Sequence, residues 1–174
     1  MYLDADTLVR RNFEELFTLP FNFAAVPDVF KNGIGWLIGF NSGVMFIQTS
    51  SQTMDNMINV LPMADFPKGY ADQGFFNLYF AHQTARLPYI YNANLAIKQR
   101  KPEVWNAILD DIRIVHYTVR KPFPLKWEMG EAELQRFFEE KKQLDGGIWN
   151  HEVEWWRETY VRMKKSLEGS SQCL

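Results

Sequence analysis

Apolar residues recur along the chain with two different periods, which predict alternating strands and helices. The uncharged run 40–48 combines Phe40 with the continuous apolar stretch 44–47, as in a buried strand. A helix capped by Ser50 or Ser51 should follow and end at Pro62. Its apolar face is marked by Met54, Met57, Ile58 and Leu61.

The same reasoning predicts further elements downstream. A second helix starts at Asp72, where a carboxylate suits the positive end of the helix dipole, and continues to residue 80. Residues 88–91 and 113–116 are expected as short strands, with a helix at 102–109 between them. Beyond Gly130, the pair Gly146-Gly147 separates two amphipathic helices. Their apolar residues are Leu134, Phe137, Phe138 and Leu144, then Val153, Trp156, Tyr160, Met163 and Leu167.

The alternation of elements predicts an α/β fold with a mixed, mostly parallel sheet flanked by helices. Acidic residues are sparse between positions 21 and 100, whereas charged residues of both signs crowd positions 120–174. No low-complexity linker separates the two regions. We therefore expect a domain at residues 1–125 and a helical C-terminal extension at 126–174.

Composition and charge exclude several classes of protein. The 174 residues are 47% hydrophobic, enough for a core, and their net charge of −2 gives no electrostatic case for binding nucleic acid. The single cysteine, Cys173, permits no internal disulfide and no thiolate metal cluster. The residues at the N-terminus do not have the basic, apolar pattern of a signal or transit leader, so we expect none, and we expect no membrane span because no run is apolar enough. We expect a cytoplasmic location.

Asp4-Ala5-Asp6 is the first candidate site, because it directly follows the apolar pair Tyr2-Leu3. Carboxylates at positions i and i+2 after a strand can both turn toward one divalent cation. Oxygen ligands suit Mg²⁺ or Mn²⁺ bridging a diphosphate, and ligands of open α/β sheets bind at the carboxyl ends of strands. The alternative is a solvated turn.

His116 is the second candidate, at the end of the predicted strand 113–116 and followed by Lys121-Pro122. A neutral imidazole can complete a Mn²⁺ site, while a lysine neutralises phosphate oxygens. The alternatives are a hydrogen-bonded structural histidine and a surface lysine before a turn.

Two polar islands interrupt apolar surroundings, at Asn41-Ser42-Gly43 and Asp72-Gln73-Gly74. Buried amides and carboxylates need partners, and sugar hydroxyls are suitable because each is both donor and acceptor. Helix capping and turn formation are the alternative explanation.

These elements occur in the order YLDADTLV, FNSGVMFI, ADQGFFN and IVHYTVRKPF. In this order they resemble the family 8 glycosyltransferases, the retaining group that contains glycogenin and galactinol synthase. The resemblance covers residues 1 to about 125 and implies a GT-A type fold. It also implies that the chain lacks the N-terminal part that binds the nucleotide base.

The resemblance implies a role for each candidate residue. Mn²⁺, with Mg²⁺ as the alternative, would be bound by Asp4, Asp6 and His116. The substrate-binding residues would be Asp28, Asn41, Ser42, Asp72, Gln73 and Lys121, with Lys121 on the diphosphate and Asp72 and Gln73 catalytic. The expected reaction moves glucose or galactose from a UDP-sugar to an acceptor hydroxyl with retention of configuration.

The chain also departs from glycogenin. An acidic, glycine-rich stretch is replaced by Lys68-Gly69-Tyr70-Ala71, the spacing from His116 to Lys121 is one residue shorter, and a tryptophan is replaced by Phe123. These changes weigh against self-glucosylation more than against sugar transfer.

Two rival functions stay open. An inactive fragment would bind or associate at most, and its unpaired sheet edge would favour homo-oligomers. A phosphohydrolase of the haloacid dehalogenase type also begins with Asp-x-Asp, with Asp110-Asp111 as its second acidic pair. Its threonine follows the first aspartate by four residues, whereas position 8 is Leu8.

Overall fold

The computed structural model describes residues 1–29, 36–124, 126 and 128–170 and divides into two compact units, Met1–Thr118 and Val119–Leu174. Cys173 lies outside the described residues. The division expected at residue 125 stays a prediction. Within the described ranges, no helix is both long and apolar enough to cross a membrane.

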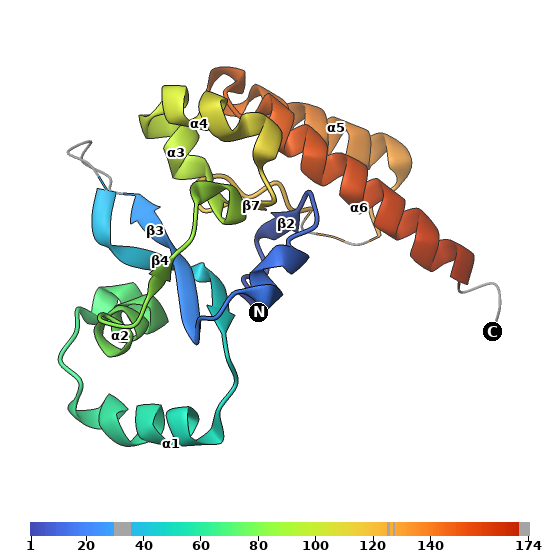
Figure 1. The fold of residues 1–174 in the computed structure, drawn as a ribbon. Helices are drawn as coiled ribbons and strands as arrows, with labels where there is room; N and C mark the ends of the chain where they lie inside the picture. Colours follow the sequence, from blue (N-terminus) through green and yellow to red (C-terminus); the bar gives the residue numbers. More distant parts are fainter. Residues whose placement is uncertain (30–35, 125, 127, 171–174) are drawn as a thin grey trace. The chain divides into compact units, whose positions relative to one another are not determined.

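The first unit alternates short strands with helices (Figure 1). Its strands are β1 (Tyr2–Leu3), β2 (Thr7–Val9), β3 (Phe23–Val29), β4 (Trp36–Ile47), β5 (Ala85–Arg86), β6 (Ala93–Asn94) and β7 (Ile114–His116). Its α-helices are α1 (Ser51–Val60), α2 (Ala71–Tyr79), α3 (Leu95–Arg100) and α4 (Pro102–Ile108). Its 3₁₀ helices are η1 (Glu14–Thr18), η2 (Leu61–Met63), η3 (Lys68–Tyr70), η4 (Tyr89–Tyr91) and η5 (Leu109–Asp111).

The strands form two mixed sheets, in the orders β1-β4-β3-β5 and β2-β7-β6. Helices accompany the sheets, so the predicted α/β class with mixed sheets is confirmed. The prediction of mostly parallel pairing is wrong, because three of the five pairings between described strands are antiparallel. The two parallel pairings join β3 to β5 and β6 to β7, strands that are separated in sequence by segments containing helices, as parallel pairing requires.

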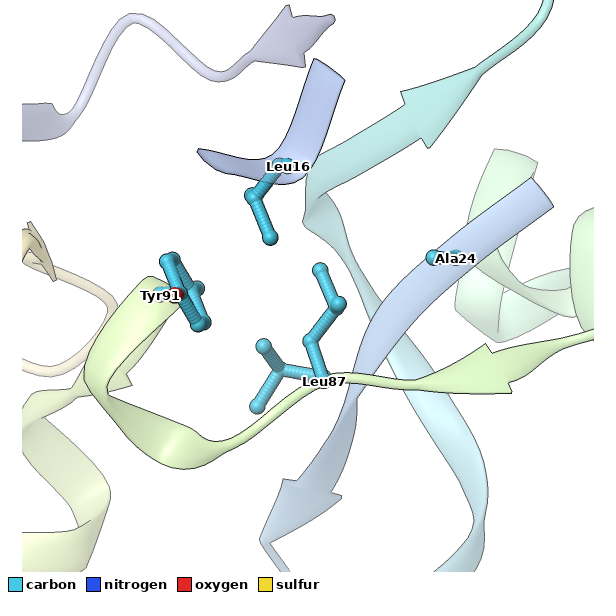
Figure 2. Close-up of a cluster of buried hydrophobic side chains, with 5 residues drawn as sticks. Leu16, Ala24, Leu87 and Tyr91 are labelled. Carbon is cyan, nitrogen blue, oxygen red and sulfur yellow. The ribbon is translucent and has the colours of Figure 1, made fainter. Parts of the chain in front are cut away.

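Strand β3 buries both of its faces, because its successive side chains point in opposite directions. Phe23 and Ala25 pack on one face with Phe40, Met45 and Phe80, and the Phe23 and Phe80 rings stack at 3.9 Å. On the other face, Ala24 and Val26 pack with Leu16, Leu87 and Tyr91. Figure 2 shows Leu16, Leu87 and Tyr91 converging beside Ala24. The core therefore lies on both sides of the four-stranded sheet.

Most predicted elements are confirmed, with shifts at their ends. The strand at 40–48 is the second half of β4, and the helix with its cap at Ser50 is α1. The strand expected at 88–91 is wrong, because the amide of Tyr91 bonds to the carbonyl of Pro88 and closes the turn η4. Pro88 has no N–H to donate to a ladder, which favours this turn.

The first sheet ends at β1, which pairs only through its β4 side among the described strands. Homo-oligomer formation through this edge stays a prediction.

The second unit consists of α5 (Glu131–Gln143), η6 (Leu144–Gly147) and α6 (Asn150–Ser170). The helices lie side by side, and the predicted glycine pair makes the turn between them (Figure 1). Gly146 and Gly147 have φ angles of 68° and 78°, a region that favours glycine. Phe138 of α5 and Val153 of α6 are buried, and the Phe138 ring contacts Tyr160 of α6.

Candidate functional site

A tight turn places the two N-terminal carboxylates where the two sheets meet. The amide of Asp4 bonds to the carbonyl of Gly43 in β4, and both the amide and the hydroxyl of Thr7 bond to the carbonyl of Asp4. Thr7 is in turn the register partner of His116 at the end of β7. The chain thereby brings Asp4, Asp6 and His116 together, although 110 residues of sequence separate the last two.

These three side chains form a cluster that fits a divalent metal ion. His116 Nε2 lies 3.2 Å from Asp6 Oδ1 and 3.8 Å from Asp4 Oδ2. One ligand atom from each residue lies within 4.8 Å of the others. The His116 side chain is 4% exposed, whereas Asp4 is 36% exposed, so the cluster is closed on the histidine side and open at Asp4. Two carboxylates and one imidazole suit Mn²⁺ better than Mg²⁺, which prefers oxygen ligands alone.

Gly43 makes room for this cluster. A Cβ at position 43 would lie 2.1 Å from His116 Cε1 and 2.9 Å from Asp4 Oδ2, far inside contact distance. The close approach of the β4 backbone to the histidine ring therefore requires glycine at this position.

The electrostatic environment acts on both His116 and Tyr2. Burial lowers the pKa of His116, against the opposing charges of Asp4 and Asp28, which favours the neutral imidazole that a metal needs. The Tyr2 hydroxyl donates to Asp4 Oδ1 at 2.7 Å, and this bond, burial and the charges of Asp4 and Asp72 raise the pKa of Tyr2 to about 12. Asp72 is thus close enough for its charge to act at this end of the sheet.

The two polar islands predicted from sequence meet in one hydrogen-bond network. Asn41 Nδ2 and the amide of Ser42 both donate to Gln73 Oε1, each at 3.2 Å. Gln73 Nε2 donates to Asp28 Oδ2 at 2.8 Å. Asn77 ties α2 to β4 through two bonds with the Phe40 backbone. These contacts bring together the side chains of Asp28, Asn41 and Gln73, with Ser42 taking part through its backbone.

Asn92 joins this network to the cluster, and the sequence analysis missed it. Its Nδ2 donates to Asn41 Oδ1 at 2.9 Å, and its Oδ1 lies 3.0 Å from His116 Nδ1. Asn92 is 1% exposed. The signal in the sequence is an amide between the apolar residues Tyr91 and Ala93, since a buried amide needs polar partners.

The remaining candidates have exposed side chains. Asp72 is exposed in the first turn of α2 and lines the rim of an apolar cavity of about 480 Å³ between α1 and α2. Lys121 is exposed and belongs to the second unit. Asp110 and Asp111, which the phosphohydrolase requires, are exposed in η5 and are not members of the metal-fitting cluster.

Comparison with known proteins points to one enzyme family. The family model described as "Glycosyl transferase family 8" matches residues 1–123. "Galactinol synthase 1" of Arabidopsis thaliana is 27% identical over 179 aligned positions, covering 86% of this chain and 51% of the relative. "Glycogenin" of Neurospora crassa is 33% identical over 119 positions, covering 67% of this chain and 16% of the relative. The chain thus spans about half the length of the galactinol synthase, and less of the glycogenin.

A solved structure supports the fold. The apo form of the glycosyltransferase GlyE of Streptococcus pneumoniae TIGR4 superposes with a TM-score of 0.50 at 24% identity. The match covers 91% of this chain and 42% of that protein. At this identity the likeness shows the fold, which is of the GT-A type expected from the motifs.

Proposed function

Because the chain belongs to glycosyltransferase family 8, we propose that it transfers glucose or galactose from a UDP-sugar to an acceptor hydroxyl with retention of configuration. The observation that carries this proposal is the cluster of Asp4, Asp6 and His116, joined by hydrogen bonds to Asn41, Gln73 and Asp28. A cation-fitting cluster beside a network of amides and carboxylates is suited to a charged diphosphate next to a sugar.

Asp4, Asp6 and His116 would hold Mn²⁺, with Mg²⁺ as the alternative. When bound, the ion supplies positive charge to the leaving diphosphate, on which negative charge develops as the sugar–phosphate bond breaks. The family resemblance assigns a second positive charge, Lys121, to the same diphosphate. The support for Lys121 is its place in the sequence motif that begins at His116.

The donor sugar is assigned to the amide network. Asp28, Asn41 and Gln73 offer the donors and acceptors that sugar hydroxyls require, and their mutual bonds hold them in fixed orientations. Ser42 would contribute to the same pocket, and Asp72 stands at the exposed start of α2 beside it.

Retention requires either two successive displacements or attack from the face that the leaving group vacates. Gln73 is an amide and a weak nucleophile, so we favour front-face attack through an oxocarbenium-like state. The acceptor oxygen bonds to the anomeric carbon as the bond to the diphosphate breaks, and the acceptor's proton passes to the leaving phosphate. Asp72 and Gln73 would orient the sugar for this step.

Calorimetric titration with UDP-glucose and UDP-galactose, with and without Mn²⁺, tests the proposal. Asp6→Asn and His116→Ala should abolish the Mn²⁺-dependent binding, because the first replaces a charged carboxylate ligand with a neutral amide and the second removes the imidazole. Asp65→Asn and His82→Ala are matched controls, since both residues are exposed and lie outside the cluster. Unchanged titration heats in the two cluster variants would exclude the proposed site.

Product analysis separates the rival functions. Transfer of the hexose to an added acceptor supports the enzyme, whereas binding without transfer supports an inactive fragment. Release of phosphate from a phosphomonoester would favour the phosphohydrolase instead.

A further inference from the structure

We propose that Asn92 is a positioning residue that keeps a proton on His116 Nδ1, and that the amide chain running from Asp28 through Gln73 and Asn41 fixes the orientation in which Asn92 does so. The inference rests on the proposed function only in taking His116 as a metal ligand. Hydrogen-bond directions decide the orientation, because the side-chain amides of Gln73, Asn41 and Asn92 each have one donor end and one acceptor end.

Two contacts fix the orientation of the Gln73 side-chain amide, which is the first anchor of the hydrogen-bond chain. A carboxylate oxygen of Asp28 accepts a hydrogen bond, so it requires the Nε2 group of Gln73, which lies 2.8 Å away. The backbone N–H of Ser42 only donates, so it requires Gln73 Oε1 at 3.2 Å. The two contacts agree, and they leave Gln73 Oε1 as the acceptor for Asn41 Nδ2. A flipped Gln73 amide would place oxygen against the Asp28 oxygen and N–H against the Ser42 N–H, so both hydrogen bonds would be lost.

The second anchor lies at Asn41. The backbone N–H of Gly43 donates to Asn41 Oδ1 at 3.0 Å, which agrees with the direction set by Gln73. Asn41 Oδ1 is therefore an acceptor also toward Asn92, which presents Nδ2 to it at 2.9 Å. The other end of the Asn92 amide, its carbonyl oxygen, must then face His116.

This orientation restricts the protonation of the imidazole. With the Asn92 carbonyl 3.0 Å from Nδ1, a lone pair on Nδ1 would face a lone pair on oxygen, whereas an N–H would be satisfied. Asn92 and His116 are 1% and 3% exposed, so bulk water offers little compensation. The Nδ1–H form leaves Nε2 with its lone pair directed toward Asp4 and Asp6, as a metal ligand requires.

The restriction matters because Asp6 favours the opposite arrangement. Asp6 Oδ1 lies 3.2 Å from Nε2 and attracts a proton to that nitrogen when no cation is present. Free neutral histidine also prefers the proton on Nε2. Asn92 opposes both tendencies, so the site avoids the neutral form that cannot bind a metal through Nε2.

Nitrogen-15 NMR of the full chain, labelled at histidine and free of metal at about pH 8, tests this directly. The expected result is a neutral His116 with its proton on Nδ1. The two other histidines, His82 and His151, are exposed and serve as internal references for the solution preference. Observation of His116 mainly as the neutral Nε2–H tautomer would overturn the proposal.

Paired variants test the chain of anchors. Asn41→Leu removes the acceptor that orients Asn92, so the His116 proton should shift to Nε2 and Mn²⁺ binding should weaken about 10- to 100-fold. Asn41→Asp keeps an acceptor toward both Gly43 and Asn92, so it should keep the proton on Nδ1, at some loss of stability because its second oxygen faces Gln73 Oε1. Equal tautomer populations in these two variants would refute the role of Asn41 as an anchor.

Asn92 itself supplies a second pair. Asn92→Leu should allow the His116 proton to shift from Nδ1 to Nε2. Asn92→Asp, which keeps an acceptor beside Nδ1, should hold the proton on Nδ1 even at some loss of stability. A general packing effect would not separate the leucine and aspartate variants in this way. Because the tautomer is measured without substrate, a correct tautomer with no UDP-sugar binding would defeat the proposed function alone.

Discussion

At the scale of single residues, the site depends on one position with no side chain. Gly43 follows Asn41 and Ser42 in β4, and its backbone contacts three parts of the site: the Asp4 amide, the Asn41 side chain and the His116 ring. A methyl group there would collide with the ring that the network holds in place. The conformational freedom of glycine is not the reason for its presence, since the close approach of the ring decides the matter.

Gly43→Ala should therefore displace His116, cost about 1–3 kcal/mol of stability and weaken Mn²⁺ binding. Thermal unfolding and Mn²⁺ titration measure the two effects. Gly69→Ala is the matched control, because a Cβ at position 69 meets no atom within 4 Å. Wild-type Mn²⁺ affinity in Gly43→Ala would show that the ring does not need this space.

At the scale of elements, α1 differs from the α-helices α2, α3 and α4 of the first unit because none of its residues is buried. Its Met54 and Ile58 side chains are more than half exposed, and a hydrogen bond from the Tyr79 hydroxyl to Asn56 links it to α2. Among its residues, the partly buried Met57 packs against a core cluster, so α1 has few tertiary contacts and relies more than the other helices on local interactions such as the Ser50 cap. Ser50 Oγ accepts from the amide of Thr53 at 3.2 Å.

Ser50→Ala should cost about 1 kcal/mol of helix stability, because it leaves that amide without its cap. Since α1 has no buried residue and only the partly buried Met57 reaches a core cluster, the change should appear as faster hydrogen exchange of the amides within 51–60, with little change in global unfolding. Ser51→Ala, one residue into the helix, should leave exchange almost unchanged. Equal exchange in the two variants would contradict a capping role.

At the scale of the whole molecule, acid stability should depend on an ion-pair network in the second unit. Glu154 bonds to Arg157 and, at 2.6 Å, to Lys142. The hydrogen bond from Arg157, together with Lys142, lowers the pKa of Glu154 to about 2, from 4.5 in the unfolded chain. A lowered carboxylate pKa stabilises the fold above pH 4.5, and this contribution is lost as the pH falls toward 2.

Glu154→Gln should thus destabilise the protein by about 1 kcal/mol at pH 7, a modest value because the pair is partly solvated. The difference from wild type should shrink between pH 4.5 and pH 2, as followed by chemical denaturation. Glu140→Gln, at an exposed position of α5, controls for the loss of one charge. A destabilisation that does not vary with pH would exclude this origin.

Prediction from sequence succeeded where local rules dominate. Helical spacing, the Ser50 cap and the glycine pair at 146–147 gave helices close to those observed, because these signals act within a few residues. The ordered motifs also indicated which side chains meet at the cluster. The strand at 88–91 failed because β propensity was outweighed by a proline turn, and the parallel pairing failed because strand direction depends on the connections of the whole chain.

The sequence by itself determined the family, the α/β class and the three residues able to hold a metal, since ordered motifs and periodicity are properties of the chain. Only the tertiary structure decided that Asn92 touches His116 and that Gly43 must be small. Hydrogen-bond direction and close approach depend on atoms brought together from distant segments. No pattern in the linear sequence shows that the Asn92 amide faces the His116 imidazole.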